Sequence, residues 1–162
     1  MTKNNLKEAF AGESQARNKY AAFARKADAE GYQSVAKLFR VASEAEAIHA
    51  YSEFKALDAI KTTAENLQAA IEGETYEFTT MYPEFIKKAE AEGENQALKA
   101  FRNANEAEKI HAGLYQKALA NLEDKAAAEY YLCTVCGNIF ENEYPEQCPI
   151  CNASSRAFKK VD

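Results

Sequence analysis

Two stretches of the sequence repeat each other at an offset of 62 residues. The residues that recur in the same order are aromatic, small, cationic, acidic and imidazole side chains: Tyr20 and Tyr82, Phe23 and Phe85, Gly31 and Gly93, Phe39–Arg40 and Phe101–Arg102, Glu46 and Glu108, Ile48 and Ile110, His49 and His111. Both stretches are rich in Ala and Glu and carry apolar residues at helical spacing, and a glycine interrupts the helical pattern in each. The repeat therefore predicts a duplicated hairpin of two helices.

The helical pattern extends over most of the first 122 residues. We expect helices over about residues 6–31, 32–58, 65–93 and 94–122, with a break at Lys61–Thr63. Four helices of this length predict an all-α four-helix bundle. Two equivalent hairpins can pack about a pseudo-twofold axis, which places matching residues on opposite sides of one central site.

The register of the repeat slips by one residue in the third helix. Gly12–Glu13 matches Gly73–Glu74 at an offset of 61, whereas Tyr82 keeps the offset of 62, and Pro83 follows directly. Proline inside a helix removes a hydrogen bond and clashes with the preceding turn. We therefore expect a local change of helical winding near this position, where such irregularities often accompany functional sites.

The chain has only two histidines, and each follows a glutamate by three residues: His49 follows Glu46 and His111 follows Glu108. Residues three apart share one face of a helix, so each pair can act as a metal clip. Carboxylates on an interior stripe are costly unless a cation neutralises them. Carboxylate oxygens together with imidazole suit iron or manganese, so we expect a site for two metal ions.

The first and third helices offer the remaining donors. Glu13 and Glu74 stand 33 and 34 residues ahead of the two clips, and Glu77 adds a seventh candidate that has no counterpart in the first repeat. Tyr20 and Tyr82 follow at matched positions and are either core aromatics or hydrogen-bond partners of the ligands.

A single Glu-x-x-His pair is common on solvated helix faces, and only the repeated pair with supporting glutamates favours metal. We interpret the remaining glutamates on these helices as surface charge or local salt bridges: Glu44, Glu53, Glu72 and Glu106.

All four cysteines lie near the end of the chain, in the pattern Cys133-x-x-Cys136 and Cys148-x-x-Cys151. A segment that begins at Tyr130 is too short to fold on apolar burial alone, so it needs a metal or disulfides. Disulfides are disfavoured in the cytoplasm. The spacing indicates a four-thiolate metal site but does not distinguish zinc from iron.

These patterns divide the chain into a helical domain over residues 1–122, a linker over 123–129 that is either helical or mobile, and a small β-rich domain over 130–162. The net charge of −5 without a basic stripe argues against nucleic acid as a partner. Neither a secretory apolar core nor a run of about 18 apolar residues occurs, so we expect no membrane association and a cytoplasmic protein.

The two knuckles, Cys136–Gly137 and Cys148–Cys151, resemble those of rubredoxins. The segment between them is shorter than in free-standing rubredoxins, and Asn152 stands where glycine is common. Together with the phrases Ala11–Tyr20 and Gly73–Pro83, this combination resembles rubrerythrin over nearly the whole chain. The resemblance implies a ferritin-like bundle followed by a rubredoxin-like domain.

The resemblance also implies the metal ligands and the activity. It assigns a di-iron site and a single thiolate-bound iron to these residues: Glu13, Glu46, His49, Glu74, Glu77, Glu108 and His111, and Cys133, Cys136, Cys148 and Cys151. It implies a peroxidase that reduces hydrogen peroxide to water, with electrons from NAD(P)H passed by separate redox proteins such as rubredoxin or its reductase. In the family one iron leaves Glu77 for His49 on reduction, and Tyr20 and Tyr82 count with these two residues as candidate catalytic groups.

Two other functions compete with the peroxidase. One is a ferroxidase that handles iron, although storage needs no electron return path of the kind a thiolate-bound iron provides. The other is a zinc-loaded interaction module fused to a bundle that buffers metal. We also expect a homodimer, head-to-tail or domain-swapped, in which the thiolate iron of one chain serves a neighbour unless the linker folds back.

Overall fold

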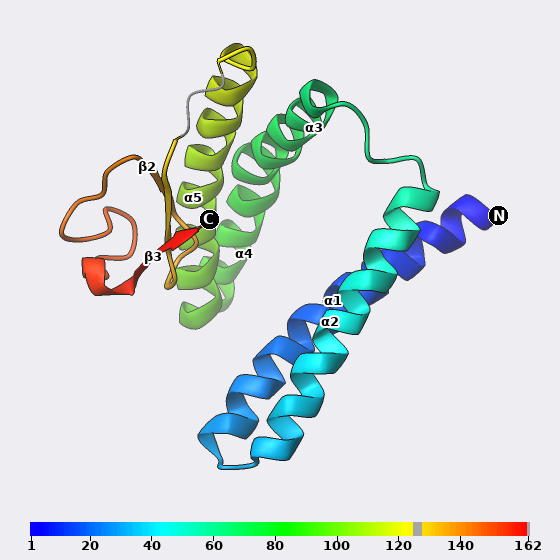
Figure 1. Ribbon diagram of the computed structural model, residues 1–162. Helices are drawn as coiled ribbons and strands as arrows, with labels where there is room; N and C mark the ends of the chain where they lie inside the picture. Colours follow the sequence, from blue (N-terminus) through cyan, green and yellow to red (C-terminus); the bar gives the residue numbers. More distant parts are fainter. Residues whose placement is uncertain (125–127, 162) are drawn as a thin grey trace. The chain divides into compact units, whose positions relative to one another are not determined.

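The computed structural model describes residues 1–124 and 128–161 and divides the chain into two compact units, Met1–Lys61 and Thr62–Asp162. Each unit is built on a helical hairpin, and the second also carries a small sheet (Figure 1). Residues 125–127 of the predicted linker lie outside the described residues, so the predicted domain limits stay a prediction. No helix within the described ranges is long and apolar enough to cross a membrane.

The first unit is an antiparallel pair of helices, α1 (Thr2–Ala29) and α2 (Gln33–Ala56), drawn blue to cyan in Figure 1. The turn between them is closed at Gly31, whose φ of 84° is accessible to glycine, and the Tyr32 N–H donates to the Ala27 carbonyl at 2.9 Å. Small residues bring the helices close together, and the buried ones are Ala24, Ala27, Ala36 and Ala50.

The second unit begins with a helical stretch in three parts: α3 (Thr63–Tyr76), the π-helical turn η1 (Glu77–Met81) and α4 (Tyr82–Glu92). A capping box starts it, because Thr62 accepts from the Glu65 N–H while Glu65 accepts from the Thr62 N–H. Helix α5 (Asn95–Ala120) returns antiparallel after a turn at Gly93, where φ is 73°. All four predicted helices are thus present, the third interrupted by the π turn.

The repeat seen in the sequence is a repeat of packing. In each hairpin a tyrosine and two phenylalanines form a trio, namely Tyr20, Phe23 and Phe39, and Tyr82, Phe85 and Phe101. The two phenylalanine centroids are 5.5 Å apart in both trios. Equivalent ion pairs close the turns: Arg40 with Asp28, and Arg102 with Glu90. These contacts confirm the duplicated hairpins.

The π turn explains the slip in register. From Glu13 to Tyr20 is seven residues, whereas from Glu74 to Tyr82 is eight, so the third helical stretch contains one residue more than the first. A π turn holds one extra residue without breaking the helix, and Tyr82 therefore recovers the packing position of Tyr20. Pro83 stands in the first turn of α4, where a missing N–H is tolerated. The predicted change of winding is confirmed.

The C-terminal part of the second unit is a three-stranded antiparallel sheet in the order β2-β1-β3. Its strands are β1 (Tyr130–Cys133), β2 (Ile139–Glu141) and β3 (Phe158–Val161), and the short 3-10 helix η2 (Ser155–Ala157) precedes the last strand. Phe158 packs against Phe140 at 4.7 Å and against Tyr144 at 5.4 Å between ring centroids. This small aromatic core leaves much of the stability to the cysteine knuckles.

The sheet lies against α5 of the same unit (Figure 1). Lys117 forms an ion pair with Glu141 of β2, and the His111 ring hydrogen-bonds to Gly137 between the first two strands. An apolar cavity of about 430 Å³ separates α5 from the strands, with Leu114 and Leu132 among its walls. The chain therefore folds back on its own fourth helix, and this contact brings the two kinds of predicted metal site together.

Candidate metal centres

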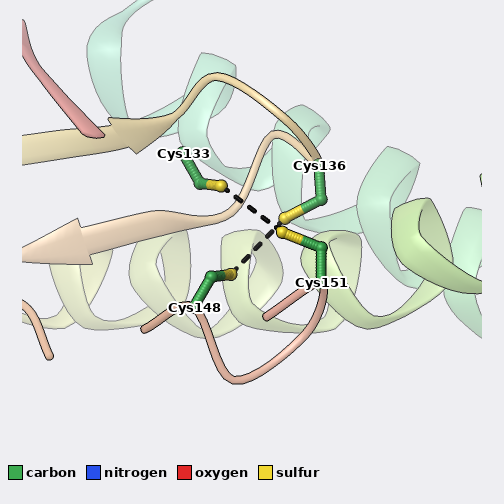
Figure 2. A group of neighbouring side chains, drawn as sticks. All are labelled: Cys133, Cys136, Cys148 and Cys151. Atoms are coloured by element: carbon green, nitrogen blue, oxygen red, sulfur yellow. Dashed lines mark hydrogen bonds between the residues drawn. The ribbon is translucent and has the colours of Figure 1, made fainter. Parts of the chain in front are cut away.

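The four cysteine side chains converge on one point (Figure 2). Their Sγ atoms all lie within 4.8 Å of one another, with Cys133 and Cys151 at 3.7 Å and Cys136 and Cys148 at 3.6 Å. A tetrahedron with metal–sulfur bonds of ~2.3 Å has edges of about 3.8 Å. The described chain leaves all four thiols without a disulfide. This four-cysteine site therefore fits a tetrahedral thiolate metal such as iron or zinc.

The two knuckles are held by equivalent backbone turns. The Gly137 N–H donates to the Cys133 carbonyl, and the Asn152 N–H donates to the Cys148 carbonyl, each at 2.9 Å. Both turns need a left-handed residue, with φ of 82° at Gly137 and 60° at Asn152. Asparagine adopts this conformation more readily than most residues, so the departure from glycine at Asn152 leaves the turn intact.

The thiols do not titrate alike. Burial raises the pKa of Cys136. Burial also acts to raise the pKa of Cys148, but hydrogen bonds from the backbone N–H groups of Cys151 and Ile150 outweigh it and lower the value to about 7. Donors aimed at a sulfur stabilise its thiolate form. The second knuckle is thus prepared to supply the anionic ligand that a metal requires.

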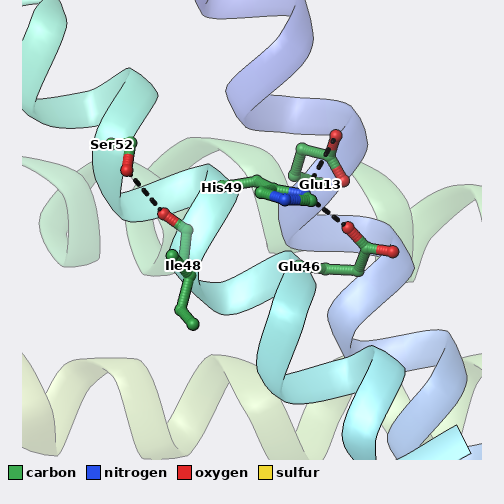
Figure 3. Close-up of polar contacts among 5 residues, drawn as sticks. All are labelled: Glu13, Glu46, Ile48, His49 and Ser52. Carbon is green, nitrogen blue, oxygen red and sulfur yellow. Dashed lines mark hydrogen bonds and ion pairs between the residues drawn. The ribbon is translucent and has the colours of Figure 1, made fainter.

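The first unit carries a cluster of three metal-type donors, Glu13, Glu46 and His49, which we call the first half-site. The His49 Nδ1 atom lies 2.9 Å from the Glu46 carboxylate and 3.9 Å from that of Glu13. Figure 3 shows these three side chains pointing toward one another from α1 and α2. A hydrogen bond between the two carboxyl groups raises the pKa of Glu13. The His49 side chain is 57% exposed in the single chain.

The second unit carries the equivalent cluster, Glu74, Glu108 and His111, which we call the second half-site. The His111 Nδ1 atom lies 2.7 Å from Glu108 and 3.9 Å from Glu74. Burial, followed by a hydrogen bond and repulsion from Glu108, raises the pKa of Glu74 to about 7. A carboxyl group that loses its proton only near neutral pH indicates a position where a bound cation would stabilise the ionised carboxylates.

The pKa of Glu74 gives a prediction for the metal-free protein. Glu74 keeps its proton in the folded state up to about pH 7 but loses it near 4.5 when unfolded. Its contribution to stability is therefore complete below pH 4.5 and is lost as pH rises through 7, by about 3 kcal/mol at most. Urea unfolding of metal-free protein at pH 5 and pH 8 measures this loss. Glu74→Gln should reduce the difference, and an equal loss in that variant would contradict the assignment.

Glu77 and Tyr82 lie beside the second half-site. Burial and repulsion from Glu108 raise the pKa of Glu77, although its oxygens are outside the tight cluster. Burial raises the pKa of Tyr82, with further contributions from Glu108 and Glu77. Tyr20 packs its ring against Phe39 at 6.1 Å. The structure thus brings six of the seven predicted carboxylate and histidine ligands into two clusters and sets the seventh, Glu77, at the edge of one.

Sequence reasoning missed one residue near the first half-site. Glu53 was grouped with surface charges, but its Oε2 atom is buried and has no hydrogen-bond partner among the described residues, whereas Glu44, Glu72 and Glu106 are exposed. The repeat could have singled it out, because Glu53 matches Tyr115 on the stripe that carries Glu108 and His111.

One hydrogen bond joins the second half-site to the four-cysteine site. The His111 Nε2–H donates to the Gly137 carbonyl at 2.9 Å, and Gly137 follows Cys136 in the chain. This bond fixes the tautomer that leaves Nδ1 facing Glu74 and Glu108. The His111 side chain is only 14% exposed. The contact links the two sites within one chain, whereas electron transfer to a neighbouring chain stays a prediction.

Comparison with known proteins agrees with both parts of the chain. The Rubrerythrin family model matches residues 4–119, and the model for the rubredoxin-like domain of rubrerythrin matches residues 131–159. Nigerythrin of Nitratidesulfovibrio vulgaris is 37% identical over 164 residues, covering 93% of this chain and 81% of the relative. Rubrerythrin-1 of Clostridium acetobutylicum is 37% identical over 173 residues, covering 93% of this chain and 89% of that protein.

A solved structure of nigerythrin in its fully reduced, all-ferrous state matches with a TM-score of 0.61 and 35% identity, over 99% of this chain and 87% of that one. That protein holds iron, and the donor sets found here fit the same kind of metal. The expected fold is confirmed, with helical hairpins followed by a small strand-containing part that holds the four cysteines. By its sequence, its fold and its donor sets, this chain belongs to the rubrerythrin family.

Proposed function

We propose that the protein reduces hydrogen peroxide to water at a di-iron site formed by the two half-sites, and that an iron in the four-cysteine site returns the electrons. The observation that carries the proposal is the hydrogen bond from His111 to Gly137, which links the two kinds of site. Besides orienting His111 as a ligand, this contact places a one-electron thiolate site next to the second half-site, which supports a site that is re-reduced.

The iron supplies the redox chemistry when bound. Two ferrous ions together can deliver the two electrons that cleavage of the peroxide bond consumes, so no half-reduced oxygen radical needs to escape. The half-sites supply four carboxylates and two imidazoles, a hard donor set that suits iron. The four-cysteine site passes one electron at a time, so it must be re-reduced twice in each turnover by a separate redox protein that draws on NAD(P)H.

The two protons that peroxide reduction consumes would come from solvent, and residues of the chain would relay them. Glu77 stands next to the second half-site, and the raised pKa that burial gives it lets the carboxyl group hold a proton closer to neutral pH. Glu77 and His49 are the residues that would hold the metal in its oxidised and reduced forms, respectively. When Glu77 is free of the metal it would take up a proton from solvent, and it could then donate that proton to the departing oxygen.

This role predicts the behaviour of Glu77→Ala. The variant should remain folded and keep its metal, because six ligands remain, yet its di-ferrous form should react with peroxide about 10²-fold more slowly. Stopped-flow mixing of reduced protein with peroxide measures this rate. The control is Glu84→Ala, an exposed glutamate in the first turn of α4. Equal rates in both variants would remove Glu77 from the mechanism.

Ferroxidase activity is the second candidate. The family and the half-sites are compatible with it, but the His111–Gly137 bond favours a site that is re-reduced. The two functions differ in their oxidant and in their need for a donor. Protein supplied with a reducing system and hydrogen peroxide should consume peroxide continuously, with little uptake of oxygen. Consumption of oxygen with added Fe²⁺, and no donor-driven peroxide loss, would favour the ferroxidase.

We further propose that the working unit is a domain-swapped homodimer. Ferritin-like bundles join their second and third helices by a long crossover. Here Ala56 and Thr63 are separated by six residues, and a hydrogen-bonded turn with Asp58 at φ 54° takes up the first of them. The rest of the segment, from Ala59 to Thr63, spans about 14 Å when fully extended. To bring Glu74 to the same height as His49 in a crossover bundle, the connecting segment must span about 27 Å along the bundle axis. The segment is too short for this span, so a second chain would supply the other half-site.

A cytoplasmic location completes the proposal, because four cysteines that serve as metal ligands rather than disulfides suit a reducing compartment.

A further inference from the structure

Glu53 is a half-buried glutamate with one buried carboxylate oxygen, and the assigned ligand set does not use it. It lies on α2, four residues after His49, and its Oε2 atom exposes less than 1 Å² with no hydrogen-bond partner among the described residues. It stands seven residues after Glu46 and four after His49, so it shares their face of α2, although its oxygens are outside the tight cluster of the first half-site. A carboxylate oxygen removed from water without a donor or a cation is unfavourable, and the position therefore lacks a counter-charge.

The repeat gives an independent indication of where residue 53 points. Its equivalent in the second hairpin is Tyr115, which stands four residues after His111 and seven after Glu108 on α5. Tyr115 therefore shares their helix face, and it lines one cavity together with His111. Because the two hairpins pack alike, the same helical position should direct Glu53 toward Glu13 and the rest of the first half-site.

The two half-sites are unequal without Glu53. The second has Glu77 at its edge, whereas the first has Ala16 at the matching position of α1. Within the first unit, Glu13, Glu46 and His49 supply three clustered donors, besides any donor that reaches the metal from the second half-site. Glu53 approaches from the other helix and offers the oxygen donor that Ala16 cannot.

We propose that Glu53 is a further carboxylate ligand of the metal bound at the first half-site. Its oxygen would give that metal a fourth protein donor from the first unit, and the metal would neutralise the unpaired carboxylate. The inference rests on the proposed function only in requiring that a metal binds at the half-sites. The ligand that fits is a hard divalent cation such as Fe²⁺ or Mn²⁺.

Titration with Mn²⁺ alone tests the inference without relying on catalysis. The full-length protein is first loaded with Zn²⁺ at the four-cysteine site, and binding of Mn²⁺ is then followed by calorimetry in wild type and Glu53→Gln. We expect one of the two Mn²⁺ ions to bind about 10- to 100-fold more weakly in the variant. The melting temperature of the metal-free variant should not fall, because the amide removes an unpaired charge. Glu44→Gln, exposed on the same helix, is the matched control.

The outcomes separate the inference from the proposed function. Wild-type protein that binds no Mn²⁺ would refute the di-metal site itself. Two Mn²⁺ ions bound by Glu53→Gln with wild-type affinity would leave the di-metal site standing and show that Glu53 is not a ligand. If Glu53→Gln loses stability as well as affinity, Glu53→Tyr decides, since it copies Tyr115. Weak binding by that folded variant supports the inference, and wild-type affinity overturns it.

Discussion

Cys136→Ser should reduce hydrogen peroxide once and then stop. The half-sites are unchanged in this variant, so its chemically reduced di-iron site should oxidise as fast as wild type when peroxide is added. Sustained turnover with an electron donor should fall to the uncatalysed background, because the thiolate site adjoining the Gly137–His111 bond no longer returns electrons. Single-turnover stopped flow and steady-state peroxide consumption, measured on the same preparation, separate the two steps.

The matched control for this experiment is Val135→Ala. Val135 is 59% exposed in the same knuckle and supplies no ligand, so its loss tests whether any change in the turn stops turnover. We expect Val135→Ala to retain steady-state activity. Donor-driven turnover that survives in Cys136→Ser would mean that the four-cysteine site is structural and that the two-centre scheme is wrong.

Two variants that are each inactive alone should form an active heterodimer. The first removes the first half-site by Glu46→Gln and His49→Gln, and the second removes the second half-site by Glu108→Gln and His111→Gln. In a domain-swapped dimer of the two, one site combines both defects, whereas the other joins two intact half-sites. Purified heterodimer should therefore hold about half the half-site iron of wild-type dimer and show about half its turnover.

Different affinity tags on the co-expressed chains allow the heterodimer to be isolated. A heterodimer of Glu44→Gln with Glu106→Gln, exposed glutamates at matched positions of the repeat, controls for the tags and should behave as wild type. If the first heterodimer stays inactive while the control works, both half-sites of a working site come from one chain. The short segment between α2 and α3 would then join helices that run in opposite directions.

Much of the fold followed from local physical signals. Helical periodicity and the glycine turns located both hairpins to within a few residues, because a left-handed turn at Gly31 or Gly93 ends a helix whatever it packs against. The half-sites followed from a spacing rule, since residues three apart on a helix must share a face. The slip in register and Pro83 indicated altered winding, although only the structure shows that it spans Glu77–Met81.

What the sequence did not predict depends on contacts between distant residues. The hydrogen bond from His111 to Gly137 joins positions 26 apart, and no periodicity specifies which carbonyl a ring nitrogen will meet. Glu53 escaped notice for a different reason. Glutamates are so frequent on these helices that spacing alone does not separate a half-buried one from its exposed neighbours, and only its buried oxygen and lack of a partner distinguish it.

The extra residue in the π turn also bears on how two copies of one hairpin can come to do different work. Faithful duplication yields identical halves, and identical halves would treat two metal ions alike. A single insertion confined to five residues leaves the aromatic packing beyond it undisturbed, because the two phenylalanine centroids are 5.5 Å apart in both hairpins. The π turn that holds the insertion begins at Glu77. One added residue thus changes the surroundings of the second half-site without a redesigned core, and the substitution of Glu77 for Ala16 adds to the difference between the halves.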